Sequence, residues 1–326
     1  MDELKIIVVG CTKNSAGYIK NHLGKLMELD ALCKEFQIIV YENDSKDATL
    51  AVLRELEGEK LKVISERGVQ RAVQKANPGI TQHWLLRTCI LARARNILVH
   101  EVTEHYSDYD YMIVSDLDEV VSRFTPKIIE KAFSAYDRSR WDALMANNIP
   151  FYYDAWALRI PQAMFGVAHS KIWDRHIDYD CWDMVKHYIE GRFGALPPAR
   201  QKEIALQSPA ASTAVNGWRT QYNIWRKEAN DIYSTPYQKI IPVTSDLIEV
   251  ESAFGGMGIY RVDKISGCTY RGTAGPCSCY KHGARGPCRP DTCEHVSFHR
   301  DMRRKHGARL FICPKLLVVC QEGHLQ

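Results

Sequence analysis

The stretch Tyr111-Met112-Ile113-Val114-Ser115-Asp116-Leu117-Asp118 decides how this sequence is interpreted. Its apolar start is typical of a strand buried on both faces of a parallel sheet. Because side chains alternate along an extended chain, Leu117 is predicted to point into the core, with Asp116 and Asp118 on the opposite side. Two such carboxylates can bind one Mn²⁺ or Mg²⁺ ion together with phosphate oxygens. Alternatively, the acidic residues cap the next helix or face solvent.

Short apolar runs and longer amphipathic segments alternate through the first half of the chain. This alternation predicts an α/β fold with a Rossmann-like, mostly parallel central sheet flanked by helices, followed by a less regular C-terminal half. The predicted strands are 6–9, 37–41, 62–64, 111–114 and 143–146, and the predicted helices are 18–29, 47–57 and 86–106. Residues 65–81 and 195–217 show no clear period and are predicted to be loops.

Polar residues follow the predicted strands where each one ends. They are Thr12 and Lys13 after the first strand, Glu42 and Asp44 after the second, and Asp116 after the fourth. Because the carboxyl ends of parallel strands share one edge of a sheet, these side chains are expected to converge on a ligand.

The cluster that contains Glu42 and Asp44 has two interpretations. Either carboxylate could accept hydrogen bonds from a ribose or a base, or the cluster could begin the next helix, with Ser45 or Asp47 as its cap. The glycine-rich turn of dinucleotide-binding folds is absent after the first strand, which argues against NAD or FAD.

Arg93 and Asn96 are spaced three apart and share one face of the predicted third helix. Arginine binds diphosphates well because its planar fork can donate two hydrogen bonds. We therefore expect this pair near a diphosphate, although Arg93 and Arg95 could equally be surface charges.

In the second half, the stretch from Glu251 and Ser252 to Gly255 and Gly256 would let the backbone approach a ligand closely, or form a turn without function. His295 is a candidate metal ligand or a buried, hydrogen-bonded residue. The aromatic-rich region 147–188 could stack on a sugar, with Asp154 nearby to bind hydroxyl groups, although most of its rings are expected in the core.

The composition describes an ordinary globular protein. The 326 residues are 45% hydrophobic and carry a net charge of +4, which is too small to argue for a nucleic-acid partner. No apolar run is long enough for a membrane span and no secretory signal is visible, so we expect a cytoplasmic protein. Five of the 11 cysteines lie between residues 268 and 293, where a zinc site, disulfides or free thiols are all open.

The order of these motifs resembles the GT-A glycosyltransferases, and more narrowly the mannosyltransferase-like group of fungal capsule synthesis and of large DNA viruses of algae. The matching pieces cover nearly the whole chain and are 9–14, 41–45, 93–96, 115–118, 252–256 and 293–296. The resemblance implies a UDP- or GDP-sugar donor, Mn²⁺ or Mg²⁺ at Asp118 with support from Asp116 and His295, and a carbohydrate or glycan acceptor. A viral origin would place the enzyme in the host cytoplasm.

The resemblance also implies which part of the chain does what. Residues 1–146 would form the nucleotide-sugar-binding half and residues 147–326 the acceptor-binding half, with a Cys-rich insertion at 268–293, in one continuous domain. An inverting enzyme, which we expect here, needs a base to deprotonate the acceptor, for which Glu251 is the first candidate and Asp154 the second. A retaining enzyme would need no such base, and the sequence alone does not separate the two. The alternatives are another metal-dependent phosphate enzyme, such as a nucleotidyltransferase or phosphatase, and a non-catalytic carbohydrate- or zinc-binding module.

Overall fold

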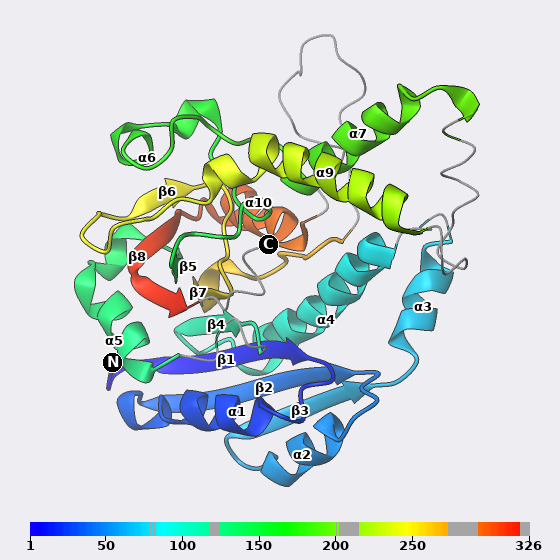
Figure 1. The fold of residues 1–326 in the computed structure, drawn as a ribbon. Helices are drawn as coiled ribbons and strands as arrows, with labels where there is room; N and C mark the ends of the chain where they lie inside the picture. The colour runs from blue at the N-terminus through cyan, green and yellow to red at the C-terminus, as the bar shows by residue number, and fades with distance from the viewer. Residues whose placement is uncertain are drawn as a thin grey trace.

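The computed structural model describes residues 1–78, 80, 83–117, 121, 124–199, 201, 215–272 and 293–319. In this part of the chain, a mixed α/β fold is built on one central sheet of eight strands (Figure 1). The sheet has the strand order β3-β2-β1-β4-β7-β5-β8-β6. The strands are β1 Lys5–Thr12, β2 Glu35–Asn43, β3 Leu61–Glu66, β4 Tyr111–Ser115, β5 Ala143–Ile149, β6 Ile248–Val250, β7 Met257–Arg261 and β8 Leu310–Val319.

The sheet is mostly parallel, as the sequence predicted. Parallel pairs join β3, β2, β1 and β4, and another joins β5 to β8, whereas β7 and β6 run antiparallel to their neighbours. The five predicted strands are confirmed by β1 to β5. The additional strands β6, β7 and β8 come from the second half of the chain, and β7 lies between β4 and β5.

Helices cover both faces of the sheet, and successive side chains along each strand supply the two cores. In β1, Ile6 and Val8 pack on one face, whereas Ile7 and Val9 pack on the other. The first core is covered by α1 Ile19–Met27, α2 Thr49–Leu56 and α5 Pro126–Ala135, and the second by α4 His83–His105 and α10 Glu294–His306. The sheet is therefore the middle of three layers.

The remaining helices lie around one side of this sandwich. They are α3 Val69–Ala76, α6 Val167–Ser170, α7 Cys181–Gly194 and α9 Val215–Tyr233. Helices α7 and α9 pack together over a small apolar cluster of their own, formed by Val185, Ile189, Trp225 and Ala229. Among the described residues, no helix is long and apolar enough to cross a membrane.

The prediction of a loop over residues 65–81 is wrong where α3 forms. Val69 and Val73, spaced one turn apart, are the buried residues of this short helix. Asp44 accepts hydrogen bonds from the backbone N–H groups of Gly68, at 2.6 Å, and Gln70, at 3.2 Å, at the start of the helix. The helix is stabilised by a carboxylate from another loop, which local periodicity does not reveal.

Candidate active site

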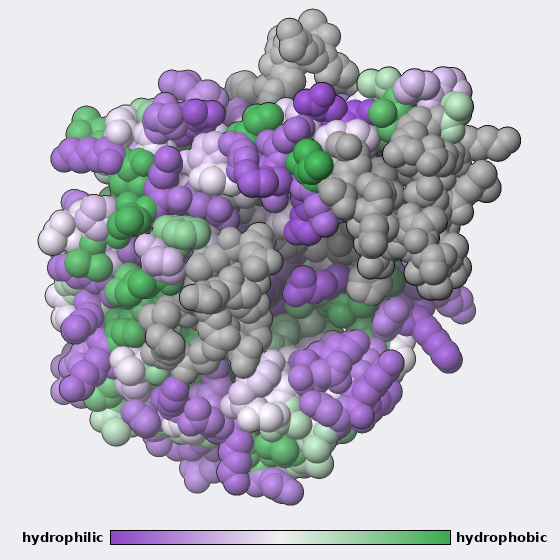
Figure 2. Space-filling view, viewed as in Figure 1, coloured by the Kyte–Doolittle hydropathy of each residue, from purple (hydrophilic) through white to green (hydrophobic). Residues whose placement is uncertain are grey.

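A cavity of about 1070 Å³ opens at the carboxyl ends of β1, β2 and β4. The hollow is visible near the middle of Figure 2, with hydrophilic side chains inside it. One wall, which we call the strand-end wall, is lined by Thr12, Lys13, Asn43 and Asp116, together with Arg95 of α4 and Glu294 and His295 of α10. The other wall is lined by residues of α7 and α9 and by further residues of α4. The expected convergence of polar strand ends is thus present for β1, β2 and β4.

Arg95 is the central cation of the strand-end wall. One of its Nη atoms donates to Asp116 Oδ1 at 3.0 Å, and the other donates to Glu294 Oε1. Arg95 is 7% exposed, and burial alone would lower the pKa of its guanidinium, but the two carboxylates raise that pKa above its ordinary value. The rings of Phe254 and Tyr270 lie 5.2 and 5.8 Å from its guanidinium carbon. This buried cation therefore orients two carboxylates at the cavity.

His295 lies in the first turn of α10, next to Glu294, and is 3% exposed. Its ring stacks on Phe254 with 3.8 Å between centroids, and within the described part of the chain neither ring nitrogen has a hydrogen-bond partner. Burial, with the charge of Arg95 nearby, lowers the pKa of His295 well below its ordinary value, so the ring is neutral. A buried neutral imidazole whose nitrogens lack partners is costly for a fold, but it has the electronic form that binds a metal.

The Gly255-Gly256 turn fixes the backbone at Asp116. Both glycines have positive φ angles, of 68° and 88°, which side-chain-bearing residues rarely adopt. The backbone N–H of Asp116 donates to Gly256 O at 2.9 Å, and Asn148 Nδ2 donates to Gly255 O, also at 2.9 Å. These glycines are not among the residues that line the cavity. Their observed contacts support the strand end that carries Asp116.

Glu42 and Asp44 lie beside the cavity wall, but their carboxylates bind the protein itself. Glu42 is fully buried and accepts hydrogen bonds from the Ser45 backbone at 2.8 Å and the Ser65 hydroxyl at 2.6 Å. Burial would raise the pKa of Asp44, yet the hydrogen bonds from Gly68 and Gln70 lower it overall. Asn43, which lies between them and lines the cavity, was not among the sequence-based candidates.

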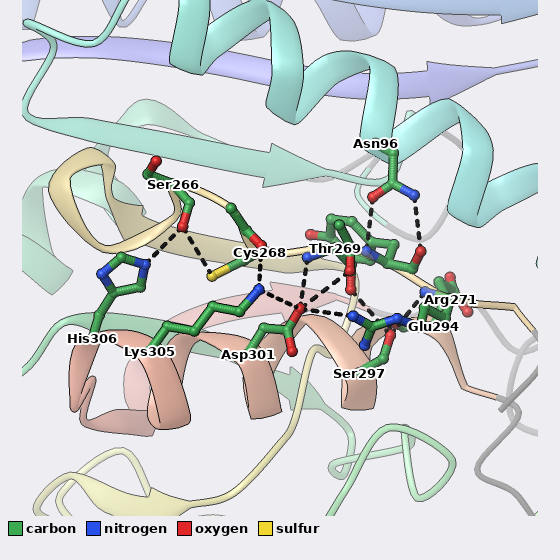
Figure 3. A network of polar contacts seen from close by, with 12 residues as sticks. Asn96, Ser266, Cys268, Thr269, Arg271, Glu294, Ser297, Asp301, Lys305 and His306 are labelled. Atoms are coloured by element: carbon green, nitrogen blue, oxygen red, sulfur yellow. Dashed lines mark hydrogen bonds and ion pairs between the residues drawn. The ribbon is translucent and has the colours of Figure 1, made fainter. Parts of the chain in front are cut away.

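Arg93 and Asn96 do not line the cavity. Arg93 pairs with Glu66 at 2.9 Å and its side chain is 46% exposed. Asn96 Nδ2 donates to Tyr270 O at 2.8 Å, and Asn96 Oδ1 accepts from Tyr270 N at 2.7 Å (Figure 3). The structure therefore places Arg95, rather than the expected pair, beside the strand-end carboxylate.

The two candidate bases occupy different surroundings. Asp154 lines the cavity and accepts hydrogen bonds from the backbone of Gly255 at 3.0 Å and of Ala157 at 3.1 Å. Burial raises the pKa of Asp154 above its ordinary value despite these hydrogen bonds. Glu251 is exposed and does not line the cavity, and its neighbour Ser252 is buried against His299 Nδ1 at 2.9 Å. The geometry favours Asp154 over Glu251.

Two predictions concern residues whose placement the structure does not give. Asp118 lies outside the described residues, as does most of the Cys-rich insertion, including Cys277, Cys279 and Cys288. Among the described residues, no group of three or more His, Cys, Asp or Glu side chains forms a metal cluster, and Cys268 and Cys293 are free thiols.

Arg95 and Glu294 form an ion pair at the strand ends that the sequence did not predict. The spacing along the helix favoured Arg93 over Arg95, and Glu294 was not a candidate. Their pairing joins residues 199 positions apart, so no local pattern reports it. The one available signal was that Arg95 and Glu294 both lie within the stretches 93–96 and 293–296 that carried the resemblance.

Comparison with known proteins gives structural similarity only. No protein-family profile and no curated protein sequence matches the chain. Among solved structures, residues 1–349 of Staphylococcus aureus TarS are 19% identical, over 50% of this chain and 40% of that one, with a TM-score of 0.31. The mannosyltransferase PcManGT from Pyrobaculum calidifontis, in complex with GDP-Man and Mn²⁺, is 17% identical, over 45% and 36%, also with a TM-score of 0.31.

A third structure overlaps more of the chain. Glucosyl-3-phosphoglycerate synthase from Mycobacterium tuberculosis, in complex with Mn²⁺, UDP and phosphoglyceric acid, is 11% identical. The overlap covers 97% of this chain and 67% of the synthase chain, with a TM-score of 0.37. This chain spans less than half the length of the first two structures, at 40% and 36%. Overlaps of this identity and extent assign neither an activity nor a substrate to the chain.

Proposed function

We propose that this protein is a metal-dependent glycosyltransferase that moves a sugar from a UDP- or GDP-linked donor to a hydroxyl group of a carbohydrate acceptor. One observation carries the proposal. At the carboxyl ends of parallel strands, a large cavity brings together Asp116, the buried cation Arg95 and a neutral His295 whose ring nitrogens have no hydrogen-bond partner among the described residues. Ligands of open α/β sheets bind at such strand ends.

The described side chains are chemically suited to a divalent cation. His295 offers a neutral ring nitrogen, Asp116 offers a carboxylate, and Glu294 Oε2 is a further buried oxygen without a hydrogen-bond partner. We assign Asp116, Asp118 and His295 as the residues that would hold Mn²⁺ or Mg²⁺, the types of ligand these ions accept in proteins. When bound, the ion would offset the negative charge that builds on the departing diphosphate.

The nucleoside would bind at the ends of β1 and β2. Thr12, Lys13 and Asn43 line the cavity there and offer hydroxyl, ammonium and amide groups. In this proposal Glu42 and Asp44 stabilise the protein rather than contact the donor. The oxygens of Glu42 accept hydrogen bonds from Ser45 and Ser65, and Asp44 accepts one from the backbone of Gly68. Arg95 would act through Asp116 and Glu294, holding both carboxylates in one orientation.

Asp154 is our candidate for the base of an inverting transfer. In that reaction the acceptor hydroxyl oxygen forms a bond to the anomeric carbon as the bond from that carbon to the diphosphate breaks, and the hydroxyl proton passes to a carboxylate. A raised pKa makes a carboxylate a better proton acceptor while it remains ionised near neutral pH. Burial raises the pKa of Asp154, and its carboxylate lines the cavity.

The test uses the purified protein with a panel of UDP- and GDP-sugars, without acceptor and with Mn²⁺. We expect slow release of nucleoside diphosphate from at least one donor, no release after chelation with EDTA, and recovery when Mn²⁺ is restored. Asp116→Asn and His295→Ala should each lower the rate by about a hundredfold or more, since a bound metal contributes several kcal/mol to such reactions.

His306→Ala is the matched control, because His306 lies at the other end of the same helix and bonds to Ser266 O at 2.8 Å. Its rate should equal that of the unchanged protein. If no donor releases nucleoside diphosphate, or if mass analysis finds nucleoside monophosphate or inorganic phosphate instead, glycosyl transfer is the wrong assignment.

A further inference from the structure

The cavity has a second wall whose chemistry differs from that of the strand ends. Its volume of about 1070 Å³ is at the upper end of the roughly 300–1,000 Å³ that holds one small molecule, so there is room for a second substrate. The second wall is formed largely by α7 and α9, which lie side by side and share their own apolar cluster (Figure 1). This helical pair can therefore present side chains to a ligand from a stable support.

The same pair of residue types faces the cavity from each helix. On α7, Trp182 and Lys186 line it, and on α9, Tyr222 and Arg226 do so. Each pair is spaced four residues apart, which places an aromatic ring and a cation on one helix face, one turn from each other. The rings of Trp182 and Tyr222 belong to residues that are 38% and 37% exposed, so part of each is open to a ligand.

The cation of α9 contacts the aromatic ring of α7. The guanidinium carbon of Arg226 lies 5.8 Å from the ring centroid of Trp182, which is a cation–π distance. Among the described residues, no carboxylate pairs with Arg226. Lys186 lies 3.5 Å from Glu190, but both side chains are substantially exposed, at 31% and 52%, and such pairs are weak.

The charge on this wall is positive overall. From α7 and α9 the charged lining residues are Lys186, Arg226 and Glu190, and α4 adds Arg87. Aromatic rings stack on the apolar faces of sugars, whereas guanidinium and ammonium groups bind carboxylate and phosphate. A neutral glycan would need the rings but would leave Arg226 without an anionic partner among the described residues.

We infer that the α7–α9 wall is an acceptor subsite for a sugar that carries a negative charge, either a carboxylate or a phosphate. Trp182 and Tyr222 contact the sugar ring, and Arg226 with Lys186 binds the anionic group. The inference rests on the proposed glycosyltransferase function, because it names the acceptor class of that same cavity.

The test measures binding of matched sugar pairs by saturation-transfer NMR and titration at low ionic strength. One pair is methyl glucuronide and methyl glucoside, and the other is mannose 6-phosphate and mannose. We expect the charged member of at least one pair to bind about tenfold more tightly, which is the scale of a hydrogen bond to a charged group. The pair that shows the preference distinguishes a carboxylate from a phosphate as the recognised group.

Arg226→Gln and Lys186→Gln should each reduce that preference severalfold, and both changes are at exposed or half-buried positions that do not endanger folding. Arg192→Gln is the control, since Arg192 is also on α7 but bonds to Tyr188 and Glu228 and does not line the cavity. It should leave the preference unchanged.

Equal binding of charged and neutral members, no binding of any of the four sugars, or a preference that survives both substitutions would overturn the inference. Release of nucleoside diphosphate by the unchanged protein distinguishes a wrong acceptor class from a wrong proposed function. If release occurs while the sugar pairs fail, only the acceptor class is wrong, and if release is absent, the proposed function itself fails.

Discussion

Arg95 is a buried cation whose two carboxylate partners come from distant parts of the chain. Asp116 follows β4 and Glu294 begins α10, and the guanidinium joins them beneath the cavity. Removal of one member of a buried ion pair is strongly destabilising because it leaves uncompensated charge in a low-dielectric interior. The side chain of Arg95 therefore contributes to stability and to the orientation of the site together.

Arg95→Met should lower the free energy of unfolding by roughly 3–5 kcal/mol, because Asp116 and Glu294 then lack their cation. Arg93→Met is the matched control two positions away, since Arg93 pairs with Glu66 at an exposed site and such pairs contribute about 1 kcal/mol or less. Urea denaturation followed by circular dichroism measures both. Equal losses for the two variants would show that Arg95 is not the central cation described here.

At this scale the sequence predicts side-chain chemistry better than side-chain partners. Asp116, His295 and Asp154 all line one cavity, and each was chosen for what its own atoms can do. Arg93 was preferred to Arg95 because only spacing along the helix was available, and the deciding contact is with residue 294. Partners that distant are set by the packing of α4 against α10.

At the scale of elements, the turn before β7 has no room for a side chain at Gly255. Gly255 has a φ of 68°, and a Cβ there would lie 2.7 Å from Ala146 O and 2.9 Å from Asn148 Oδ1. Gly267 has a φ of 69°, and a Cβ there would meet no atom within 4 Å. The two glycines share one backbone conformation and differ only in their surroundings.

Gly255→Ala should therefore cost more stability than Gly267→Ala. Both variants bear the strain of a left-handed residue, about 1–2 kcal/mol, and only the first also displaces the backbone of β5. Thermal unfolding measures both variants, and the difference between their losses of stability is the cost of the steric clash at residue 255. We also expect Gly255→Ala alone to weaken Mn²⁺-dependent donor hydrolysis, because Gly256 O accepts the Asp116 N–H. Identical unfolding temperatures would refute this role of the turn.

Asp301 fixes helix α10 to the first residues of the Cys-rich insertion. Its Oδ2 accepts hydrogen bonds from Thr269 N at 3.2 Å and Arg271 Nη2 at 3.1 Å, and Lys305 Nζ lies 3.3 Å away (Figure 3). Burial would raise the pKa of Asp301, but Arg271 and Lys305 lower it below its ordinary value. A carboxylate with a depressed pKa stabilises the fold above the pKa of the unfolded chain and loses that contribution as the pH falls through its folded value.

Asp301→Asn should lower the free energy of unfolding by about 1.5–3 kcal/mol at pH 7, the range for hydrogen bonds to a charged group. The difference from the unchanged protein should shrink as the pH falls below about 4, where the carboxylate of the unchanged protein also becomes neutral. Urea denaturation at several pH values gives both curves. A difference that stays constant from pH 7 to pH 3 would show that the charge of Asp301 contributes nothing.

Helices and strands could be predicted where their hydrophobic pattern is local, and they were missed where pairing with distant strands forms them. Strands β1 to β5 and helices α1, α2 and α4 have continuous apolar runs or amphipathic stripes. Strand β7, Met257–Arg261, contains Gly258 and follows two other glycines, so its sequence is typical of a turn. Strand β6 has only three residues, and β8 contains Pro314. Their place in the sheet is set by pairing with distant strands.

At the scale of the whole molecule, the α/β class and the mostly parallel sheet are confirmed, and the strand order follows from no local signal. The sheet joins strands from both sides of residue 146, because β7 and β8 flank β5. The cavity likewise takes one wall from the strand ends and the other from helices of the second half. In the proposed function, one sheet would therefore support both the donor and the acceptor.

The position of β7 between β4 and β5 also has a consequence for how the chain folds. Ser115 pairs with Met257 in the ladder, so the sheet closes only after most of the chain has been synthesised. Contacts this distant in sequence slow folding, because a long loop must close before they form. The backbone of Asp116 gains its bond to Gly256 in the same step. An incompletely folded chain would therefore lack the ordered strand end that carries Asp116, and the donor hydrolysis that we propose should appear during refolding only with the last, slowest phase.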